Sequence, residues 1–498
     1  MPLLDSLKSK IKAKASESGI PGSSNLTRST HSSPPLGPND VFRYRQQRGV
    51  NLGSWFVLEQ WITPEPFKNA AGTKQSDLDI ARGKDAKAVL EHHWDTWITD
   101  EDWDWIRERG FNSVRLPIGY YHLTQPCPKV LEGTDFESHA DVFGGAWQRI
   151  TKSIEKAGSM GLGVLVDLHA AAGGQNDDGH SGCSGKPNLF SSKKNLASTS
   201  QALRFLATYL APIPHVIGLQ LLNEPANNNS IQGWYESTIA ELRPICGPDF
   251  PLYVHDAWDA QWYAQWVGKR DDFVVLDHHL YRCFTDRDNG MNGDQHAQDL
   301  RGGFAGTFGG QSGQARGQLV VAEWSASLSP KGIGHLPAGE QDRHRREFVK
   351  AQLQLYEKNT GGWWFWTLKL AEPWNAGWSA KNAAQAEILP KVGEAKTGAP
   401  PSGAKDQTAK KAESDHRGYW SSNGGSPNPD LFAPAYSQGW DDALLFRTHS
   451  AGASSIGFLD QWTRRRRAEY EAAHGGCGEA VWEWEHGFKQ GVQGCQGA

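Results

Sequence analysis

Two glutamates follow apolar segments of the same design, about a hundred residues apart in the chain. Residues 216–225 read VIGLQLLNEP, a run rich in branched side chains that ends in proline, and Glu224 is its only carboxylate. Residues 319–325 read LVVAEWS and carry Glu323 at the same place relative to the apolar run. Such runs predict strands buried on both faces. We therefore expect two parallel strands that each deliver one carboxyl group to the same rim of a barrel.

Paired carboxyl groups on one rim suit the hydrolysis of a glycosidic bond. One group protonates the leaving oxygen, and the other either attacks the anomeric carbon or activates a water molecule. Each glutamate could instead have a purely structural role, in a salt bridge or as a helix cap. The neighbouring residues favour chemistry, because Asn223 can bind a sugar hydroxyl and Arg115 can hold a carboxylate ionised through two parallel hydrogen bonds.

The two segments belong to a series of eight, separated by stretches long enough for a helix each. The series comprises residues 48–53, 113–119, 161–169, 216–225, 251–256, 273–281, 319–325 and 361–369. Alternating strands and helices imply parallel pairing, and eight repeats imply a (β/α)8 TIM barrel of the α/β class. In one connection, Thr99 and Asp102 predict a capping box and Gly110 a helix stop. Polar residues late in the strands predict the catalytic face, and these are Arg115, His169, Glu224, Asp256, His279, Tyr281 and Glu323.

The barrel is expected over residues 41–380, and the composition of the remaining residues indicates three further segments. Residues 1–40 are rich in Lys, Ser, Pro and Gly and predict a disordered tail. Residues 381–415 are rich in Ala, Lys, Gly and Pro and predict a flexible insertion or linker. Residues 416–498 predict a helical extension packed on the barrel. Its arginines, 464–467, are expected to pair with nearby acidic residues and not to bind nucleic acid.

Charge and composition limit the partners. The net charge is -5 with both signs interspersed, which favours neither nucleic acid nor an anionic membrane. The 22 tryptophans favour a sugar ligand, because indole rings stack on sugar faces. The sequence contains no run of eighteen apolar residues, so no membrane span is predicted. The first residues also lack the apolar core of a signal peptide. Six cysteines without CxxC spacing favour free thiols, so a cytoplasmic protein is expected. The sequence does not predict an oligomeric state.

Eight motifs carry a family resemblance. They are NLGSWFVLE (51–59), VRLPIG (114–119), DLH (167–169), LNEP (222–225), HD (255–256), DHHLY (277–281), AEWS (322–325) and FWT (365–367). In this order they resemble glycoside hydrolase family 5, and within it the fungal exo-β-1,3-glucanases. The C-terminal part resembles the extension of an intracellular branch of that group.

The resemblance implies a retaining glucan exo-1,3-β-glucosidase without metal or cofactor, with Glu224 as acid/base and Glu323 as nucleophile. The charge on its partner should favour a protonated Glu224. Trp366 is implied as the floor of the sugar site and Glu59 as a ligand of sugar hydroxyls at its closed end. The complete set of implied supporting residues is Glu59, Arg115, His169, Asn223, His279, Tyr281 and Trp366. His278 and His279 are neighbours on a strand and should face opposite sides, which argues against a zinc pair.

One position departs from the family pattern. Asp178 stands where the exo-glucanases usually place a phenylalanine that clamps the leaving sugar. The β-1,3 linkage is therefore less firmly implied than a β-glucoside substrate, and a β-1,6-glucan or the β-glucoside of a lipid stays open. A barrel that binds glucan without cleaving it is a further alternative. The presence of both Glu224 and Glu323 argues against it.

Overall fold

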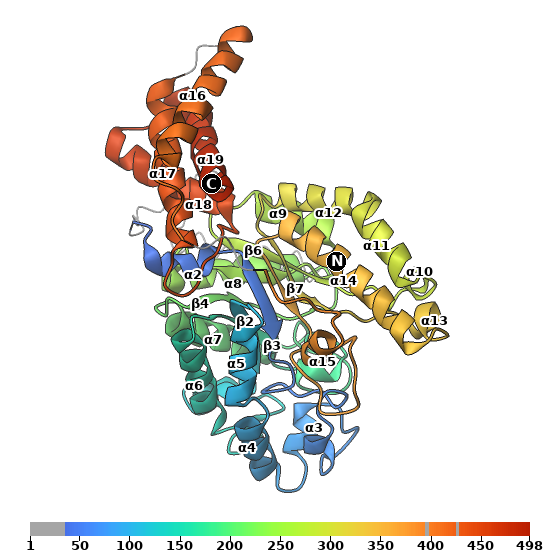
Figure 1. Ribbon diagram of the computed structural model, residues 1–498. Coiled ribbons are helices and arrows are strands. Elements are labelled where there is room, and N and C mark those ends of the chain that lie inside the picture. The colour runs from blue at the N-terminus through green and yellow to red at the C-terminus, as the bar shows by residue number, and fades with distance from the viewer. Residues whose placement is uncertain (1–34, 394–397, 425–427) are drawn as a thin grey trace, which may run out of the picture. The chain divides into compact units, whose positions relative to one another are not determined.

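The computed structural model describes residues 35–393, 398–424 and 428–498, and within them eight parallel strands close into a barrel (Figure 1). The strands follow one another around the barrel in chain order, and β8 pairs with β1. They are β1 (Gln47–Asn51), β2 (Ser113–Gly119), β3 (Gly163–Ala170), β4 (Val216–Gln220), β5 (Leu252–His255), β6 (Val274–Leu280), β7 (Leu319–Trp324) and β8 (Gly362–Phe365). Each strand lies within one of the eight apolar segments or extends at most one residue beyond it, so the predicted (β/α)8 fold is confirmed.

Close packing at the β1–β8 seam requires a glycine. Gly49 pairs in register with Trp364. A Cβ at position 49 would lie 2.0 Å from the Trp364 side chain, so any larger residue would displace the indole. Nearly all strand residues are buried, because one face of each strand fills the barrel and the other meets the helices.

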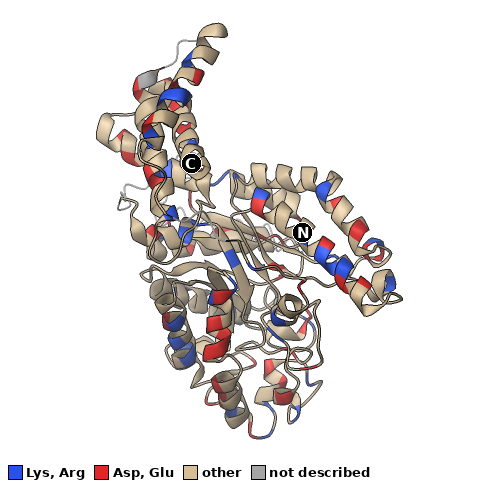
Figure 2. Ribbon diagram, viewed as in Figure 1, with Lys and Arg blue, Asp and Glu red and all other residues tan. Residues whose placement is uncertain are grey.

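Helices connect the strands. Those of the barrel are α2 (Val41–Tyr44), α3 (Asp77–Ala81), α4 (Ala86–Thr96), α5 (Asp100–Glu108), α6 (Ala146–Ser159), α7 (Lys193–Leu210), α8 (Ile231–Cys246), α9 (Ala260–Gly268), α10 (Asp286–Asn289), α11 (Gly293–Arg301), α12 (Gly303–Gln314), α13 (Pro330–Ile333), α14 (Ala338–Asn359) and α15 (Ala380–Gln385). The predicted capping box of Thr99 and Asp102 begins α5, and Gly110 follows its end with a φ of 84°. Both signs of charge occur on these helices (Figure 2). Ion pairs such as Lys156 to Asp100, 2.7 Å, join neighbouring ones.

The described part of the chain ends in four helices of 16 to 19 residues. They are α16 (Ala404–Ser422), α17 (Pro429–Arg447), α18 (Leu459–His474) and α19 (Val481–Gly497). Two helices correct the predicted flexible linker over 381–415, because α15 covers its first residues up to Gln385 and α16 its last ones from Ala404. The Ala, Lys, Glu and Gln of this stretch, interpreted as a linker composition, are strong helix formers.

The predicted tail also ends earlier than expected. Residues 1–34 of it lie outside the described residues. Leu36 is buried, and its N–H donates to Glu469 Oε1 of α18 at 2.8 Å. A 3-10 helix, Pro38–Asp40, then leads into α2. Residues 36–40 therefore belong to the folded part, because this apolar side chain is buried and its backbone has a partner on the extension.

The extension packs against the amino ends of the barrel strands. The Phe458 ring lies over Gly361, directly before β8, and meets Phe273, directly before β6, edge to face at 5.2 Å. Both aromatic side chains are buried. This end of the barrel is opposite to the rim at which the strands deliver their polar residues, so the extension closes the barrel away from the predicted site.

The four arginines of α18 pair with acidic residues, two within the extension and two on the barrel, where Arg464 lies 3.6 Å from Asp271. Arg466 donates to Asp442 of α17 at 2.7 Å, and Arg467 pairs with Glu485 of α19 at 2.6 Å. Arg465 pairs with Asp249, which precedes β5. The predicted salt-bridged state of residues 464–467 is thus confirmed. No helix in the described part of the chain is both long and apolar enough to span a bilayer.

Candidate active site

The predicted site residues meet at the carboxyl ends of the strands. Their positions are β2 for Arg115, β3 for His169, β6 for His279 and β7 for Glu323, the segment after β1 for Glu59, the turn after β4 for Asn223 and Glu224, and the residues after β6 and β8 for Tyr281 and Trp366. All except Glu59, Glu224 and Tyr281 are nearly or fully buried. The barrel thus brings seven separate segments of the chain to one site.

Glu323 receives hydrogen bonds on both carboxylate oxygens. Arg115 Nη1 donates to Oε1 at 2.8 Å, and the Tyr281 hydroxyl donates to Oε2 at 2.7 Å. In the β6–β7 pairing His279 lies in register with Glu323, and His279 Nδ1 is 3.5 Å from Oε2. Two directional donors therefore fix the plane of a carboxylate that is only 4% exposed.

Arg115 is the centre of the polar network. Its Nη2 donates to Asn223 Oδ1 at 2.8 Å and lies 2.9 Å from Asp167 Oδ2. Its Nε donates to Gln220 Oε1 at 2.9 Å, and Nη1 also donates to Asn51 Oδ1 at 3.0 Å. Burial would lower the pKa of Arg115, but the surrounding carboxylates, Asp167 first, raise it. A permanently charged guanidinium thus orients both the residue before Glu224 and Glu323 itself.

The backbone of Glu224 is in the left-handed region, with a φ of 39°. Its Oε1 lies 2.6 Å from His279 Nδ1, and the other nitrogen of this ring lies 3.0 Å from Asp277 Oδ2. Oε2 has a single close charged neighbour among the described residues, His180 Nε2 at 3.7 Å. His279 therefore engages one oxygen of Glu224, and the other oxygen has His180 as its neighbour.

Charge decides which of the two partners holds the proton. Burial would raise the pKa of Glu224, but the His279 imidazolium, with His180 beyond it, lowers the pKa well below its usual range. Burial would lower the pKa of His279, but Glu323, Asp277 and Glu224 raise it well above the usual range. The proton therefore lies on His279, and the expected protonated Glu224 is wrong for this state. The sequence did not show that an imidazole would contact Glu224.

His278 and His279 face opposite sides of β6, as predicted. His278 Nδ1 lies 2.5 Å from Asp256 Oδ2, and the ring contacts Phe308 of α12 at 6.2 Å. His279 points into the barrel between Glu224 and Asp277. The adjacent histidines therefore serve two different environments.

Glu224, His255 and His279 bring ligand-type atoms within 4.8 Å of one another. Burial, followed by the charge on His279, lowers the pKa of His255 to about 4, so its ring is neutral near pH 7. His255 Nδ1 accepts a hydrogen bond from the Ala257 N–H at 3.0 Å. A neutral ring that accepts at Nδ1 carries its hydrogen on Nε2 and offers no lone pair there. The cluster therefore fits a hydrogen-bonding role better than metal ligation.

His169 and Trp366 form one wall of the site. The two rings are parallel within 4° at a centroid distance of 5.8 Å. Asp167 Oδ2 holds His169 through Nδ1 at 2.6 Å, and His169 Nε2 lies 3.5 Å from Asn223 Nδ2. Flat faces of this kind bind sugar rings by stacking.

Glu59 lies apart from the buried network. It is half-buried, and Trp61 Nε1 donates to its Oε2 at 2.8 Å. Loss of hydration raises the pKa of Glu59 to about 7, although the His180 cation and the Trp61 hydrogen bond oppose the rise. Its carboxyl group therefore changes protonation near neutral pH.

Aromatic side chains border the site beside Glu59 and Tyr281. The Trp61 ring meets the Trp378 ring at 5.5 Å, and Trp378 meets Tyr281 at 5.3 Å and Phe284 at 6.1 Å. Phe284 is 68% exposed and Trp61 44%. These rings present an apolar surface next to the carboxylates, and Trp378 was not among the predicted residues.

The loop after β3 contributes residues that sequence reasoning missed. Gln175 Nε2 donates to the carbonyls of His169 at 2.6 Å and Asn223 at 3.0 Å. Asn176 Nδ2 donates to the carbonyl of Glu224 at 2.9 Å. The loop thus supports the left-handed turn that carries Glu224. The departure at Asp178 drew attention to this loop, but amide side chains that bind backbone give no distinctive sequence signal.

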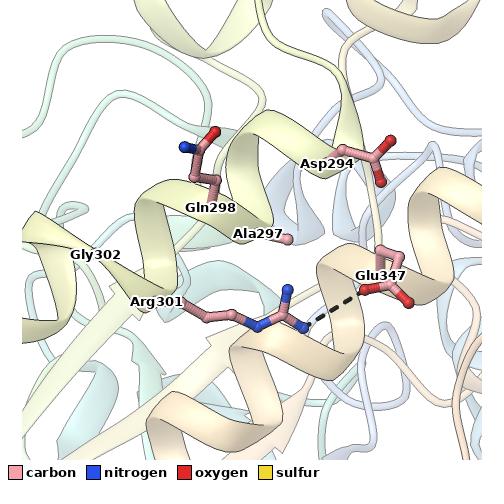
Figure 3. Close-up of a pocket in the computed structure, with 6 residues that line it drawn as sticks. All are labelled: Asp294, Ala297, Gln298, Arg301, Gly302 and Glu347. Carbon is pink, nitrogen blue, oxygen red and sulfur yellow. Dashed lines mark ion pairs between the residues drawn. The ribbon is translucent and has the colours of Figure 1, made fainter.

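A shallow pocket of about 370 Å³ lies elsewhere, between α11 and α14 (Figure 3). It is lined by Asp294, Ala297, Gln298, Arg301, Gly302 and Glu347. Arg301 and Glu347 face each other across it at 3.5 Å. None of the lining residues belongs to the paired-carboxylate site.

Two family models match the chain. The cellulase family, glycosyl hydrolase family 5, matches residues 79–372. The chain belongs to glycosyl hydrolase family 5. It is therefore a glycoside hydrolase, and the paired glutamates of this family 5 enzyme lie on the rim where its chemistry is expected. A second model, the glucan 1,3-beta-glucosidase 3 C-terminal domain, matches residues 402–498, which contain α16–α19.

Named relatives of this family 5 enzyme share nearly its whole length. Glucan 1,3-beta-glucosidase 3 of Schizosaccharomyces pombe is 30% identical over 473 residues, 91% of this chain and 96% of that protein. An uncharacterized glycosyl hydrolase of Saccharomyces cerevisiae is 28% identical over 98% of this chain and 99% of that one. Among solved structures, the rutinosidase from Aspergillus niger is 17% identical with a TM-score of 0.50, over 68% of this chain and 92% of that one. That likeness concerns the fold.

Proposed function

We propose that this enzyme is a retaining β-glucosidase that removes glucose from the ends of β-1,3-glucan chains. The observation that carries the proposal is the separation of the two carboxyl groups. His279 Nδ1 lies 2.6 Å from Glu224 Oε1 and 3.5 Å from Glu323 Oε2, so these oxygens are at most 6.1 Å apart, the sum of the two distances. Retaining glycosidases hold their carboxyl groups about 5 Å apart, whereas inverting ones need roughly 6.5 Å or more to admit water.

The contacts favour different roles for the two glutamates. Glu323, oriented by Arg115 and Tyr281, attacks the anomeric carbon, and the bond to the leaving oxygen breaks. The fraction of Glu224 that has taken up a proton from solvent on Oε2, the oxygen that His279 does not bind, gives that proton to the leaving oxygen. In the second step water loses a proton to Glu224 and attacks the same carbon, and the Glu323 carboxylate leaves. The hydrogen bond from His279 to Oε1 makes Glu224 a stronger acid.

Support for the substrate comes from the relatives and from the shape of the site. The Schizosaccharomyces pombe relative is named a glucan 1,3-beta-glucosidase. Glu59 and Trp61 stand at one end of the site, where they would bind the hydroxyls of a terminal glucose, and Trp366 would stack on its ring. Because Asp178 replaces the usual clamping phenylalanine, β-1,6-glucan and lipid β-glucosides are further candidates for the same chemistry.

Time-resolved NMR of purified enzyme with laminari-oligosaccharides tests the proposal. Glucose should be the first and dominant product, and its β-anomer should appear before mutarotation. Matched β-1,6-linked and lipid-linked glucosides in the same assay define the linkage preference. Early release of mixed oligosaccharides would contradict action at chain ends, and early α-glucose would contradict the double displacement.

We also propose that the enzyme works in a reducing compartment. The support is that all six cysteines, each within the described residues, are free thiols. Fractionation of cells combined with a thiol count on the native protein tests this. Six reactive thiols after denaturation and a cytosolic pool are expected, and disulfide-bonded protein recovered from the medium would contradict it.

A further inference from the structure

The loop after β3 holds a histidine at a defined place beside Glu224. Gln175 and Asn176 bind the backbone of the turn that carries Glu224. Asn176 Oδ1 also accepts the Asp178 N–H at 3.0 Å, and Ser181 Oγ donates to the Asp178 carbonyl at 2.8 Å. A Cβ on Gly179 would lie 2.1 Å from the Gln75 carbonyl oxygen, so the loop backbone is packed against its neighbour. The loop and the acid/base turn are thus one connected unit.

His180 projects from this loop towards the oxygen of Glu224 that His279 leaves unbound. His180 Nε2 lies 3.7 Å from Glu224 Oε2 and 3.6 Å from Asp178 Oδ2. The side chain is 15% exposed, and its ring leans against His169 at 5.2 Å and 55°. The histidine therefore lies where the leaving oxygen must approach Glu224.

The charges around His180 favour its cation. Three carboxylates face it, Asp178 from its own loop, Glu224 from the turn after β4 and Glu59 from the segment after β1, and the only facing imidazole is His169 among the described residues. Burial would lower the pKa of His180, but these carboxylates raise it to about 9. Glu224 therefore lies between two cations, His279 on one oxygen and His180 on the other.

We propose that His180 is a positioning residue that holds Oε2 of Glu224 towards the leaving group and sets the pH range over which Glu224 can protonate it. This rests on the acid/base role proposed for Glu224. A cation beside Oε2 stabilises the carboxylate, so it confines the protonated form to lower pH. Asp178 and His180 form a charged pair, 3.6 Å apart, that acts on the acid/base itself.

The test compares pH profiles of kcat/KM for two substrates. Laminaribiose has a poor leaving group and needs a proton from Glu224, whereas 2,4-dinitrophenyl β-glucoside does not. Neutral variants His180→Gln and His180→Asn should move the basic limb for laminaribiose upwards by about one pH unit, since a charge within 4–6 Å shifts a pKa by 1–3 units. His180→Lys, which keeps a cation, should leave the limb near its original place. His92→Gln, at an exposed position on α4, is the matched control.

The outcomes separate this inference from the function on which it rests. Glu224→Ala should lower kcat/KM far more for laminaribiose than for the dinitrophenyl glucoside; equal losses would overturn the acid/base role itself. If Glu224→Ala behaves as expected but neither neutral variant moves the laminaribiose limb, the role of His180 is overturned. Equal shifts for both substrates would also overturn it, because a merely structural effect does not depend on the leaving group.

Discussion

Two fully buried arginines stand at opposite ends of the barrel and use their charge differently. Arg115, at the carboxyl end, contacts the carboxylates of Glu323 and Asp167. Arg45, two residues before β1 at the amino end, donates to the backbone carbonyls of Asn112 and Gly161 and lies over the Phe42 ring at 4.8 Å. No carboxylate pairs with Arg45 among the described residues. One guanidinium joins a network of charges, and the other joins segments of backbone.

The pKa values of Arg45 and Arg115 differ in the same way as their contacts. Burial alone lowers the pKa of Arg45 to about 9, because its partners are neutral. Burial is opposed at Arg115 by Asp167, Glu323 and Asp277, and the pKa rises. Carboxylates stabilise the charge of Arg115, which orients the reacting groups. Backbone carbonyls stabilise the charge of Arg45, which joins segments at the end of the barrel that the extension covers. Replacing the two arginines should therefore affect activity and stability in different proportions.

The largest expected effect is that of Arg115→Met on activity. Glu323 and Asn223 would lose their common donor, and kcat/KM should fall about a hundred- to a thousandfold, as for the loss of a preorganised donor. Steady-state kinetics with a β-glucoside measure this. Arg48→Met removes an exposed pair with Glu357 on the outside of the barrel and serves as the matched control. An Arg115→Met enzyme within tenfold of the parent would break the comparison.

Phe458→Ala should have the largest effect on stability alone. The ring is 1% exposed between the extension and the strands, and removal of such a side chain costs about 3–5 kcal/mol of unfolding free energy. Denaturant unfolding measures the loss, with the 62% exposed Tyr419→Ala as control. kcat/KM of the folded variant should stay within twofold. A large fall in kcat/KM at full folding would show that the two ends are coupled.

Arg45→Met sharpens the comparison with a smaller effect. The carbonyls of Asn112 and Gly161 would lose a donor, which costs about 1–3 kcal/mol for buried acceptors. The melting temperature should fall while kcat/KM changes less than twofold. An activity loss as large as that of Arg115→Met would contradict the assignment of this arginine to structure.

The smallest expected effect is that of Glu59→Gln on the pH dependence of the unfolding free energy. The pKa of this carboxyl group is raised from 4.5 to about 7 in the folded protein, so its stabilising contribution is present below pH 4.5 and is lost as pH rises through 7. The side chain in Glu59→Gln does not titrate, so this pH-dependent loss of stability disappears. The unfolding free energies at pH 5 and pH 8 should therefore differ less than in the parent. An unchanged or larger difference would show that Glu59 does not titrate in this range.

Much of the fold and of the site could be predicted, because both depend on strong local signals. Apolar runs that end in Glu224 and Glu323 define strands, and parallel strands place their ends on one rim. The start of α16 was missed because the same Ala and Lys residues suit a linker and a helix. The His279 contact that removes the proton from Glu224 depends on the register of β6 with β7. His180 depends on amide–backbone bonds in a loop, which no periodicity reveals.

The most direct test of the central claim compares azide rescue of Glu323→Ala and Glu224→Ala with 2,4-dinitrophenyl β-glucoside. Without Glu323, azide attacks the anomeric carbon once, so the product should be the α-glucosyl azide. Without Glu224, Glu323 still forms the glycosyl-enzyme and azide then displaces it, so the product should be the β-glucosyl azide. NMR of the products distinguishes the two anomers. The same anomer from both variants, or the β-azide from Glu323→Ala, would contradict Glu323 as nucleophile and Glu224 as acid/base.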